Sequence, residues 1–309
     1  MVFRRSVLVG CVAIVGLNSA CTPPATTQAT PRVNVALAVG CPTGGGPAVP
    51  PAQITADGRM SSLRAPTNYR PGVAYPLLVS LHPFTVGPGG WEAISLLGQA
   101  ASGRGYWTLI PEGSPPGPRW AVPGGLDYGV DDIGWVDDLL HETANTVCVA
   151  GDRVFAAGYS AGAAMAVGLS CELPWRFRAV MAVAGSNLTL TCPTSGPTTA
   201  LIMHGTADPI APPTGQAIEF LPPLGIGVTD VVSSFAARNG CVGGPTTSAA
   251  SSSVTVSRYS CAGHATEFWS VLGGGHTWPG SPVNLDFVNG PTDQSISATT
   301  TALDYFDAS

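Results

Sequence analysis

The 309-residue sequence contains no lysine, because all 13 of its basic residues are arginine. An activated lysine amine is therefore unavailable, which excludes Schiff-base chemistry and a Ser-Lys catalytic dyad. Charged residues of both signs make up only 10% of the chain, and the formal net charge is -6. So sparse and acidic a charge pattern argues against nucleic acid as a partner.

The apolar run at the N-terminus, VLVGCVAIVGL, is too short to span a bilayer, which takes about 20 apolar residues. Arg4 and Arg5 precede it, and the small residues NSAC follow it. This pattern predicts a signal peptide over residues 1–20. Two outcomes stay open: lipid attachment at Cys21, whose preceding residues resemble a bacterial lipobox, or plain secretion after cleavage near Ala20. We expect a protein that is secreted or held by lipid on the outer face of the cell membrane.

The segment after the predicted cleavage site is rich in proline and threonine and has no charge before Arg32. Such a composition predicts a flexible tether, which we assign to residues 21–40. The length of the chain suits one large domain or two small ones. The alternation of strands and helices described below needs no second domain, so we expect residues 41–309 to form a single catalytic domain.

Patterns of metal ligands are missing. No two cysteines have CxxC spacing and no HExxH is present, so a zinc site is disfavoured. Neither a metal nor another cofactor is expected. Once the signal peptide and Cys21 are set aside, an even number of cysteines remains, which in an exported chain predicts three disulfides. These residues are Cys41, Cys148, Cys171, Cys192, Cys241 and Cys261.

Apolar runs alternate with helical patterns along most of the chain. The predicted strands cover residues 75–82, 106–112, 152–158, 178–185 and 199–205. The predicted helices cover residues 91–105, 131–147 and 229–240, and another follows Ser160. Continuous apolar strands are typical of strands buried on both faces. The alternation therefore predicts an α/β fold, in which a mostly parallel central sheet carries helices on both faces.

The stretch VFAAGYSAGAAMAVGLS, residues 154–170, places a serine between two glycines where a strand becomes a helix. G-x-S-x-G in that context is the nucleophile elbow of α/β-hydrolases. The turn is so tight that side chains at the glycine positions would collide with the neighbouring strand and helix. Ser160 would be the nucleophile, and the amide of Ala161 at the start of the helix would face the developing oxyanion.

A serine hydroxyl needs a base and an orienting acid, which in this fold follow it in the order acid, then histidine. Asp208, in MHGTADPIAP, comes directly after a predicted strand, where the fold presents its acid. His204 ends that strand and is expected to pack nearby rather than to act as the base. The base is then His264 or His276, and the glycine-rich loop around His276, GGGHTWPG, favours the latter.

Several segments around these residues resemble those of a known family. The segments HGTADPIAP, NGC and GHTWPG, together with VDDLL and DRVFAAGYSAG, resemble the exported polyhydroxybutyrate depolymerase and feruloyl esterase group. The resemblance covers roughly residues 60–280, and GHTWPG is its most specific part. It implies an α/β-hydrolase in which Ser160 is the nucleophile, His276 the general base and Asp208 its orienting acid.

The resemblance also implies the disulfide pairing, which is Cys171–Cys192, Cys241–Cys261 and Cys41–Cys148. One departure concerns the first strand, since the group usually has His-Gly after it and this chain has LHPFTVG. Proline has no N–H, but Pro83 does not occupy the donor position. We therefore expect the amide of Phe84 to be the second oxyanion donor and its ring to lie at the acyl site.

Two tryptophans are candidates for the wall of a substrate cleft, because aromatic rings bury a large area at low entropy cost. Trp278 follows the expected base by two residues, and packing in the core is the alternative for it. Trp120 lies in the Gly/Pro-rich stretch PGPRWAVPGG, which we expect to form a loop over the active face, as does PVNLDFVNGPTD.

These observations predict an exported serine esterase that cleaves feruloyl, acetyl or short hydroxyalkanoate esters. Small or oligomeric esters are favoured over crystalline polymer, because the extra linker and binding domain of specialised depolymerases are not seen after His276. A monomer is expected. Two rival interpretations remain: a catalytically silent cell-surface binding lipoprotein on the same fold, and a peptidase on the same fold.

Overall fold

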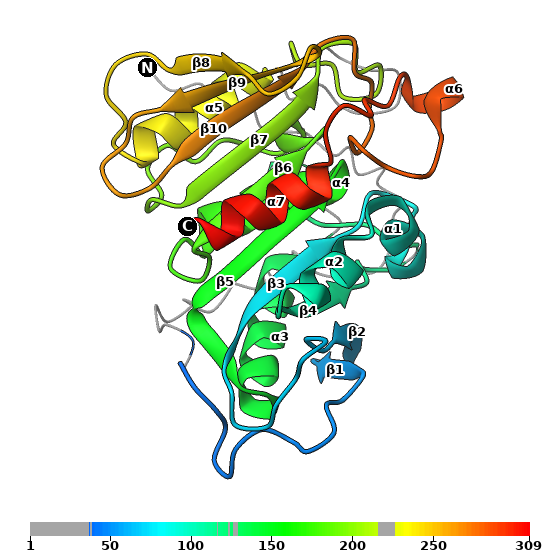
Figure 1. Cartoon of the computed structure of the whole chain (residues 1–309), viewed down its shortest axis with the longest axis vertical. Helices are drawn as coiled ribbons and strands as arrows, with labels where there is room; N and C mark the ends of the chain where they lie inside the picture. Colours follow the sequence, from blue (N-terminus) through cyan, green and yellow to red (C-terminus); the bar gives the residue numbers. More distant parts are fainter. Residues whose placement is uncertain (1–36, 38, 116, 123, 126–128, 216–225) are drawn as a thin grey trace, which may run out of the picture. The chain divides into compact units, whose positions relative to one another are not determined.

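A ten-stranded sheet organises the protein (Figure 1). The computed structural model describes residues 37, 39–115, 117–122, 124–125, 129–215 and 226–309. The strands are β1 (Gln53–Ala56), β2 (Arg59–Arg64), β3 (Tyr75–Leu81), β4 (Trp107–Pro111), β5 (Val149–Tyr159), β6 (Ala179–Val183), β7 (Thr199–Gly205), β8 (Thr246–Ala249), β9 (Val254–Tyr259) and β10 (Thr266–Val271). Their order across the sheet is β1-β2-β4-β3-β5-β6-β7-β10-β9-β8. The strands from β4 to β10 in this order are parallel, and antiparallel strands extend the sheet at both ends.

Helices cover both faces of this sheet (Figure 1). They are α1 (Pro88–Ser95), α2 (Leu97–Gly103), α3 (Asp132–Thr146), α4 (Ala161–Glu172), α5 (Val228–Arg238), α6 (Asp286–Asn289) and α7 (Ala298–Asp307), with the 3-10 turn η1 (Ser186–Leu188). Apolar residues of α3, α4 and α5 share one core cluster, and those of α1, α2 and α7 share the other. The predicted architecture is confirmed.

Strand β3 shows how one apolar run serves both layers. Leu77, Val79 and Leu81 belong to the cluster with α3, α4 and α5, while Leu78 belongs to the cluster with α1, α2 and α7. All four are fully buried. Because successive side chains point to opposite faces of a sheet, a strand covered on both sides carries apolar residues on both faces.

The order in which the chain adds strands to the sheet reverses at β3. From β3 the chain moves outward to β4, then crosses to the far side of β3 to form β5 and continues through β6 and β7 to β10. In open parallel sheets, ligands bind in the crevice at the carboxyl ends of the strands beside such a switch point. The segments that follow Leu81 and Tyr159 therefore meet at the position where a site is expected.

One predicted helix is wrong in extent. The pattern over 91–105 is divided into α1 and α2 at Leu96, which has a left-handed φ of 53°. The carboxylate of Glu92 accepts hydrogen bonds from the amides of Gly98 at 3.0 Å and Gln99 at 2.7 Å. A carboxylate at this position satisfies the free amides that begin a helix, so Glu92 stabilises the start of α2.

Other elements had no clear pattern in the sequence. The hairpin of β1 and β2 and the C-terminal α7 were not predicted, and short α6 lies inside the segment PVNLDFVNGPTD that was expected to be a loop. All four residues of edge strand β8, TTSA, are exposed. A strand without a buried face carries no apolar alternation from which it could be predicted.

The folded body begins slightly earlier than the sequence indicates. Leu37 is buried in the core, and Gly40 exchanges two backbone hydrogen bonds with Val149. Leu37 and Gly40, which the sequence assigns to the tether, therefore belong to the folded body, and residues 21–36 and 38 lie outside the described residues. The predicted signal peptide and Cys21 lie outside the described residues. Among the described residues, none of the helices has the length and apolar character needed to cross a membrane.

The three predicted disulfides are confirmed, with the pairing that the family resemblance implies. Cys41 bonds Cys148, Cys171 bonds Cys192, and Cys241 bonds Cys261. The first bridge joins the N-terminal segment to the start of β5. The second joins the end of α4 to the segment before β7.

Loss of the Cys41–Cys148 bridge is expected to lower the free energy of unfolding more than loss of Cys241–Cys261. The two bridges have sequence separations of 107 and 20 residues. In the chain-entropy description a bridge stabilises by restricting the unfolded chain, by about 5 kcal/mol for the longer loop and about 3 kcal/mol for the shorter one. Urea unfolding of the two Cys→Ser double variants measures both losses. Equal losses would contradict this expectation.

Candidate active site

Ser160 stands at the sharp turn between β5 and α4. Its backbone has φ 57° and ψ -121°, a strained conformation for a residue other than glycine. The amide of Ser160 donates to the carbonyl of Val183 at 2.9 Å, which ties the turn to β6. Only 9% of the surface of Ser160 is exposed, so the serine is nearly buried but still reaches solvent.

The glycines on both sides of Ser160 are required by close backbone approaches. A Cβ on Gly158 would lie 2.1 Å from the carbonyl oxygen of Gly162, and one on Gly162 would lie 2.2 Å from that of Leu81. Gly185 is equally confined, because its Cβ would meet the Ser160 carbonyl oxygen at 2.2 Å. Helix α4, β3 and the turn after β6 thus approach the serine so closely that only glycine fits at these positions, as the G-x-S-x-G pattern predicts for the two glycines beside the serine.

His276 and Asp208 complete a chain of hydrogen bonds that begins at Ser160. Nε2 of His276 lies 2.8 Å from Oγ of Ser160, and its Nδ1 lies 2.9 Å from Oδ2 of Asp208. A carboxylate can only accept, so Nδ1 carries the proton and Nε2 is free to accept from the serine hydroxyl. The three predicted residues, from three separate segments, are therefore in contact in the order of a Ser-His-Asp triad.

The carboxylate of Asp208 is fixed on both of its oxygens. Oδ1 accepts from the amides of Ile210 at 2.9 Å and Ala211 at 2.7 Å, and Oδ2 faces His276. His204 lies beside it, as expected, with Nε2 donating to the Ala211 carbonyl at 2.8 Å and lying 3.3 Å from Oδ2 of Asp208. Burial alone would raise the pKa of Asp208, but hydrogen bonds from His204 and His276 outweigh it and hold the pKa well below its ordinary value. The acid is therefore ionised at neutral pH.

The loop that carries His276 is held by a residue that the sequence analysis did not single out. The hydroxyl of Tyr159, the residue before the serine, donates to the His276 carbonyl at 2.5 Å. Asn289, at the end of α6, accepts from the His276 amide through its own carbonyl at 2.6 Å. The residue before the serine and the loop after the histidine thus hold the backbone of His276, from which the imidazole extends to Ser160. No sequence motif signals either contact.

Two backbone amides beside Ser160 are the predicted oxyanion donors. Ala161 is the first residue of α4, so its N–H has no acceptor within the helix, and the positive end of the helix dipole lies at this point. Phe84 follows β3 at the switch point, and its side chain is 49% exposed. Neither amide donates a backbone hydrogen bond to another described residue.

The alternative base, His264, does not reach this site. It lies just before β10, which pairs in parallel with β7. The start of β10 is at the opposite edge of the sheet from the carboxyl ends of the strands, where Ser160 lies. The arrangement of the strands therefore agrees with the prediction that His276, and not His264, is the base.

The expectation that Trp278 and Trp120 line a substrate cleft is wrong, since each is 1% exposed. The indole of Trp278 donates to Oγ1 of Thr299 at 2.9 Å, and its ring packs edge-on against Trp91 at 5.0 Å. The indole of Trp120 donates to the carbonyl of His82 at 2.9 Å. Both rings therefore pack inside the protein. For Trp278 this is the core packing that the sequence left open as the alternative.

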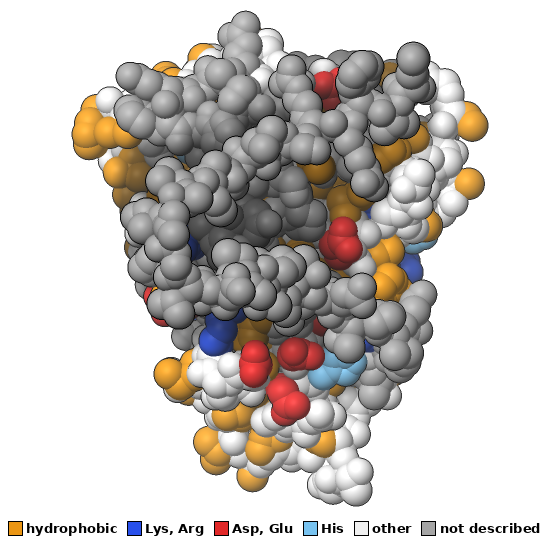
Figure 2. Space-filling view, turned by 180° about the vertical axis from the view of Figure 1, so that it is seen from behind, with side chains coloured by type: hydrophobic (Ala, Val, Ile, Leu, Met, Phe, Trp, Pro, Cys, Tyr) orange, Lys and Arg blue, Asp and Glu red, His pale blue; other side chains and the backbone are white. Residues whose placement is uncertain are grey.

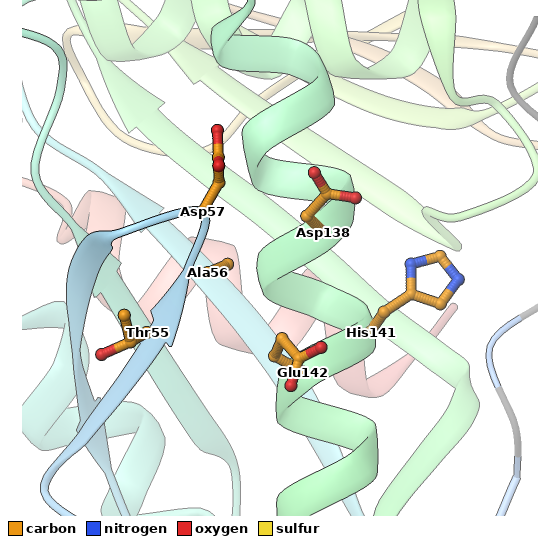
Figure 3. Close-up of a pocket in the computed structure, with 6 residues that line it drawn as sticks. All are labelled: Thr55, Ala56, Asp57, Asp138, His141 and Glu142. Atoms are coloured by element: carbon orange, nitrogen blue, oxygen red, sulfur yellow. The ribbon is translucent and has the colours of Figure 1, made fainter. Parts of the chain in front are cut away.

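A pocket of about 440 Å³ lies elsewhere, between β1 and α3 (Figure 3). Its lining residues are Thr55, Ala56, Asp57, Asp138, His141 and Glu142. Carboxylates also gather beside a histidine on the lower part of the face shown in Figure 2. The pocket contains none of the predicted site residues, so it is separate from the elbow.

Solved structures of esterases share this fold. The acetyl xylan esterase from Aspergillus awamori superposes with a TM-score of 0.61 over 81% of this chain and 94% of its own, at 14% identity. Esterase PE8 superposes with a TM-score of 0.50 over 80% of this chain and 97% of its own, at 17% identity. The sheet, its switch point and the serine elbow define an α/β-hydrolase fold.

Comparison with sequence relatives shows which proteins of this fold the chain is related to. No protein-family model matches the chain. The putative esterase NocK of Nocardia uniformis is 32% identical over 263 residues, which cover 74% of this chain and 73% of NocK. The chain therefore belongs to the same protein family as this putative esterase. Feruloyl esterase B of Piromyces equi and feruloyl esterase D of Neurospora crassa are each 26% identical, and the chain spans 44% and 55% of their lengths.

Proposed function

We propose that the protein is an exported serine esterase that hydrolyses carboxylic esters through an acyl-enzyme. The observation that carries the proposal is the continuous hydrogen-bonded chain from Ser160 through His276 to Asp208, at the switch point of the sheet. Nucleophile and base are within hydrogen-bond reach, and a third group orients the base, which is the arrangement that nucleophilic catalysis needs.

In the acylation step, Oγ of Ser160 attacks the ester carbonyl carbon while its proton passes to Nε2 of His276. The imidazolium that forms is stabilised by Asp208, which remains ionised. When the tetrahedral intermediate collapses, the bond to the alcohol oxygen breaks and His276 donates the proton to the leaving alcohol. The serine is then held as an ester of the acyl group.

Deacylation repeats this sequence with water. His276 takes a proton from the water as the water oxygen attacks the acyl carbon, and the proton returns to Oγ of Ser160 as the carboxylic acid leaves. In both steps the carbonyl oxygen becomes an oxyanion, for which the amides of Ala161 and Phe84 are the proposed donors. One such donor contributes about 3 kcal/mol to lowering the barrier.

The proposed substrates are esters of short or aromatic acids, such as acetyl, feruloyl and short hydroxyalkanoate esters. The half-exposed ring of Phe84, beside one proposed oxyanion donor, would contact the acyl group. The names of the feruloyl esterases among the relatives favour the same classes. The polyhydroxybutyrate depolymerase and feruloyl esterase group is the proposed subgroup within the family.

Export is part of the proposal. Three disulfides suit an oxidising compartment outside the cytosol, because cytosolic thiols are kept reduced. The basic and apolar pattern of residues 1–20 is that of a signal peptide. The mature protein would be secreted, or anchored by lipid at Cys21, and would act as a monomer.

The test of substrate class is a panel of methyl ferulate, p-nitrophenyl acetate, p-nitrophenyl butyrate and hydroxybutyrate oligomers, with a longer p-nitrophenyl ester and a peptide amide added. We expect kcat/KM to be highest for short or aromatic acyl groups and to fall beyond about 8 carbons, since a long acyl chain needs a larger buried tunnel and usually a mobile lid. Preference for the peptide amide would favour the peptidase interpretation. Absence of any hydrolysis would favour the silent binding lipoprotein.

A further inference from the structure

The loop that carries the Phe84 amide is governed by the ring of His82. Nδ1 of His82 donates to the carbonyl of Pro83 at 2.8 Å, and Nε2 accepts from the amide of Gly113 at 2.9 Å. In a trans peptide the carbonyl and the following N–H point in opposite directions. The bond to the Pro83 carbonyl therefore sets the direction of the Phe84 N–H, which is the proposed oxyanion donor.

His82 is itself held by a second segment. The indole N–H of Trp120 donates to the His82 carbonyl at 2.9 Å, and the two rings lie 4.7 Å apart. His82 is fully buried. Burial lowers the pKa of His82, which agrees with a neutral ring that donates at Nδ1 and accepts at Nε2.

A buried carboxylate anchors the segment that binds His82 through Gly113 and Trp120, next to each of these two residues. Asp132, the first residue of α3, is fully buried. Its Oδ1 accepts from the hydroxyl of Ser114 at 2.6 Å, and its Oδ2 accepts from the amide of Ala121 at 2.8 Å. Ser114 adjoins Gly113 and Ala121 adjoins Trp120, so one carboxylate fixes the neighbour of each residue that binds His82. We call Gly113, Ser114, Trp120 and Ala121 the clamp.

The charge of Asp132 is balanced within this network. Nη1 of Arg59 donates to Oδ1 at 2.8 Å, and the Arg59 guanidinium lies 3.6 Å from the ring centroid of Trp135. The start of α3 adds the positive end of its helix dipole. A carboxylate with these partners accepts at both oxygens at once, whereas an amide can accept at only one.

We propose that Asp132 and Trp120 are positioning residues for ester hydrolysis. Asp132 holds the clamp in place, and Trp120, as part of the clamp, binds His82. His82 in turn fixes the direction of the Phe84 amide toward the oxyanion. This inference rests on the proposed function. It also gives the buried Trp120 a role that differs from the substrate contact expected from the sequence.

The test compares Asp132→Asn and Trp120→Phe with a matched control, Asp137→Asn. Asp137 is also a buried carboxylate of α3 and binds an arginine, Arg176, at 2.6 Å, but it has no contact with the clamp. For each variant, kcat and KM are measured with p-nitrophenyl acetate well below the melting temperature, which is recorded separately. Removal of a whole oxyanion donor costs about 100- to 1000-fold in kcat.

Misdirection of one donor should cost less than its removal. We expect Asp132→Asn to lower kcat about 10- to 100-fold and Trp120→Phe about 10-fold, with KM nearly unchanged, because the amide acts on the transition state. The control Asp137→Asn should lower the melting temperature but keep the wild-type kcat. If Asp132→Asn does not fold, Trp120→Phe decides.

The inference is overturned if the kcat values of Asp132→Asn and Trp120→Phe equal that of the control, or if only KM changes. Ser160→Ala separates this result from a failure of the proposed function. If Ser160→Ala keeps wild-type hydrolysis, the serine esterase proposal itself is overturned. If Ser160→Ala is inactive while both clamp variants match the control, only the positioning role is lost.

Discussion

Replacement of His276 by alanine is expected to lower kcat by several orders of magnitude, whereas His264→Ala should leave it within about tenfold of wild type. Nε2 of His276 is 2.8 Å from Oγ of Ser160 and is the acceptor through which the hydroxyl can lose its proton. Without that acceptor the serine is a weak nucleophile. His264 precedes β10 at the other edge of the sheet and has no contact with the serine.

The measurement is kcat and KM for p-nitrophenyl acetate with both variants, together with their melting temperatures. A loss confined to His264→Ala would reverse the assignment of the base. Equal losses in both variants would be incompatible with a base that acts only at position 276.

Replacement of Asp208 by asparagine is expected to lower kcat by about 10⁴-fold, the scale found when the orienting acid of a triad is replaced in this way. The physical reason is the two amides on Oδ1. Ile210 and Ala211 both donate to that oxygen, so an asparagine at this position must keep its carbonyl oxygen there. Its NH₂ group then faces Nδ1 of His276, which can only accept from it.

His276 would then carry its proton on Nε2 and could not accept one from Ser160. Protein stability should fall less than activity, because both backbone amides keep their acceptor. The control is Asp230→Asn, since Asp230 also accepts a backbone amide, that of Gly227 at 2.8 Å, but at the start of α5. If Asp208→Asn and Asp230→Asn lower kcat equally, the orienting role of Asp208 is contradicted.

The parts of the site that could be predicted from the sequence are those whose spacing follows from backbone geometry. Gly158 and Gly162 mark the elbow, because no side chain fits between the backbones that meet there. Asp208 could be located because it follows an apolar strand directly, and strand ends meet at one edge of a parallel sheet. Ser160, Asp208 and His276 accordingly lie in contact, and their catalytic roles remain the prediction to be tested.

What could not be predicted depends on contacts between distant segments. Trp278 is close in sequence to His276, but its ring turns into the core against Trp91, and no pattern in GHTWPG shows this direction. The division of α1 from α2 depends on the carboxylate of Glu92 folding back onto later amides. The hydroxyl of Tyr159 similarly joins residues 117 positions apart. A one-dimensional pattern carries no information about such partners.

The central claim is that Ser160 is an activated nucleophile that cleaves esters, and covalent labelling by a fluorophosphonate probe tests it most directly. The probe requires a serine that is deprotonated as it attacks, and mass mapping of the labelled peptides identifies the residue that carries the adduct. We predict one adduct, on Ser160, formed in step with the loss of p-nitrophenyl acetate hydrolysis and absent from Ser160→Ala. An unlabelled Ser160 in protein that still hydrolyses the ester, or an adduct on another residue that accounts for the lost activity, would contradict the claim.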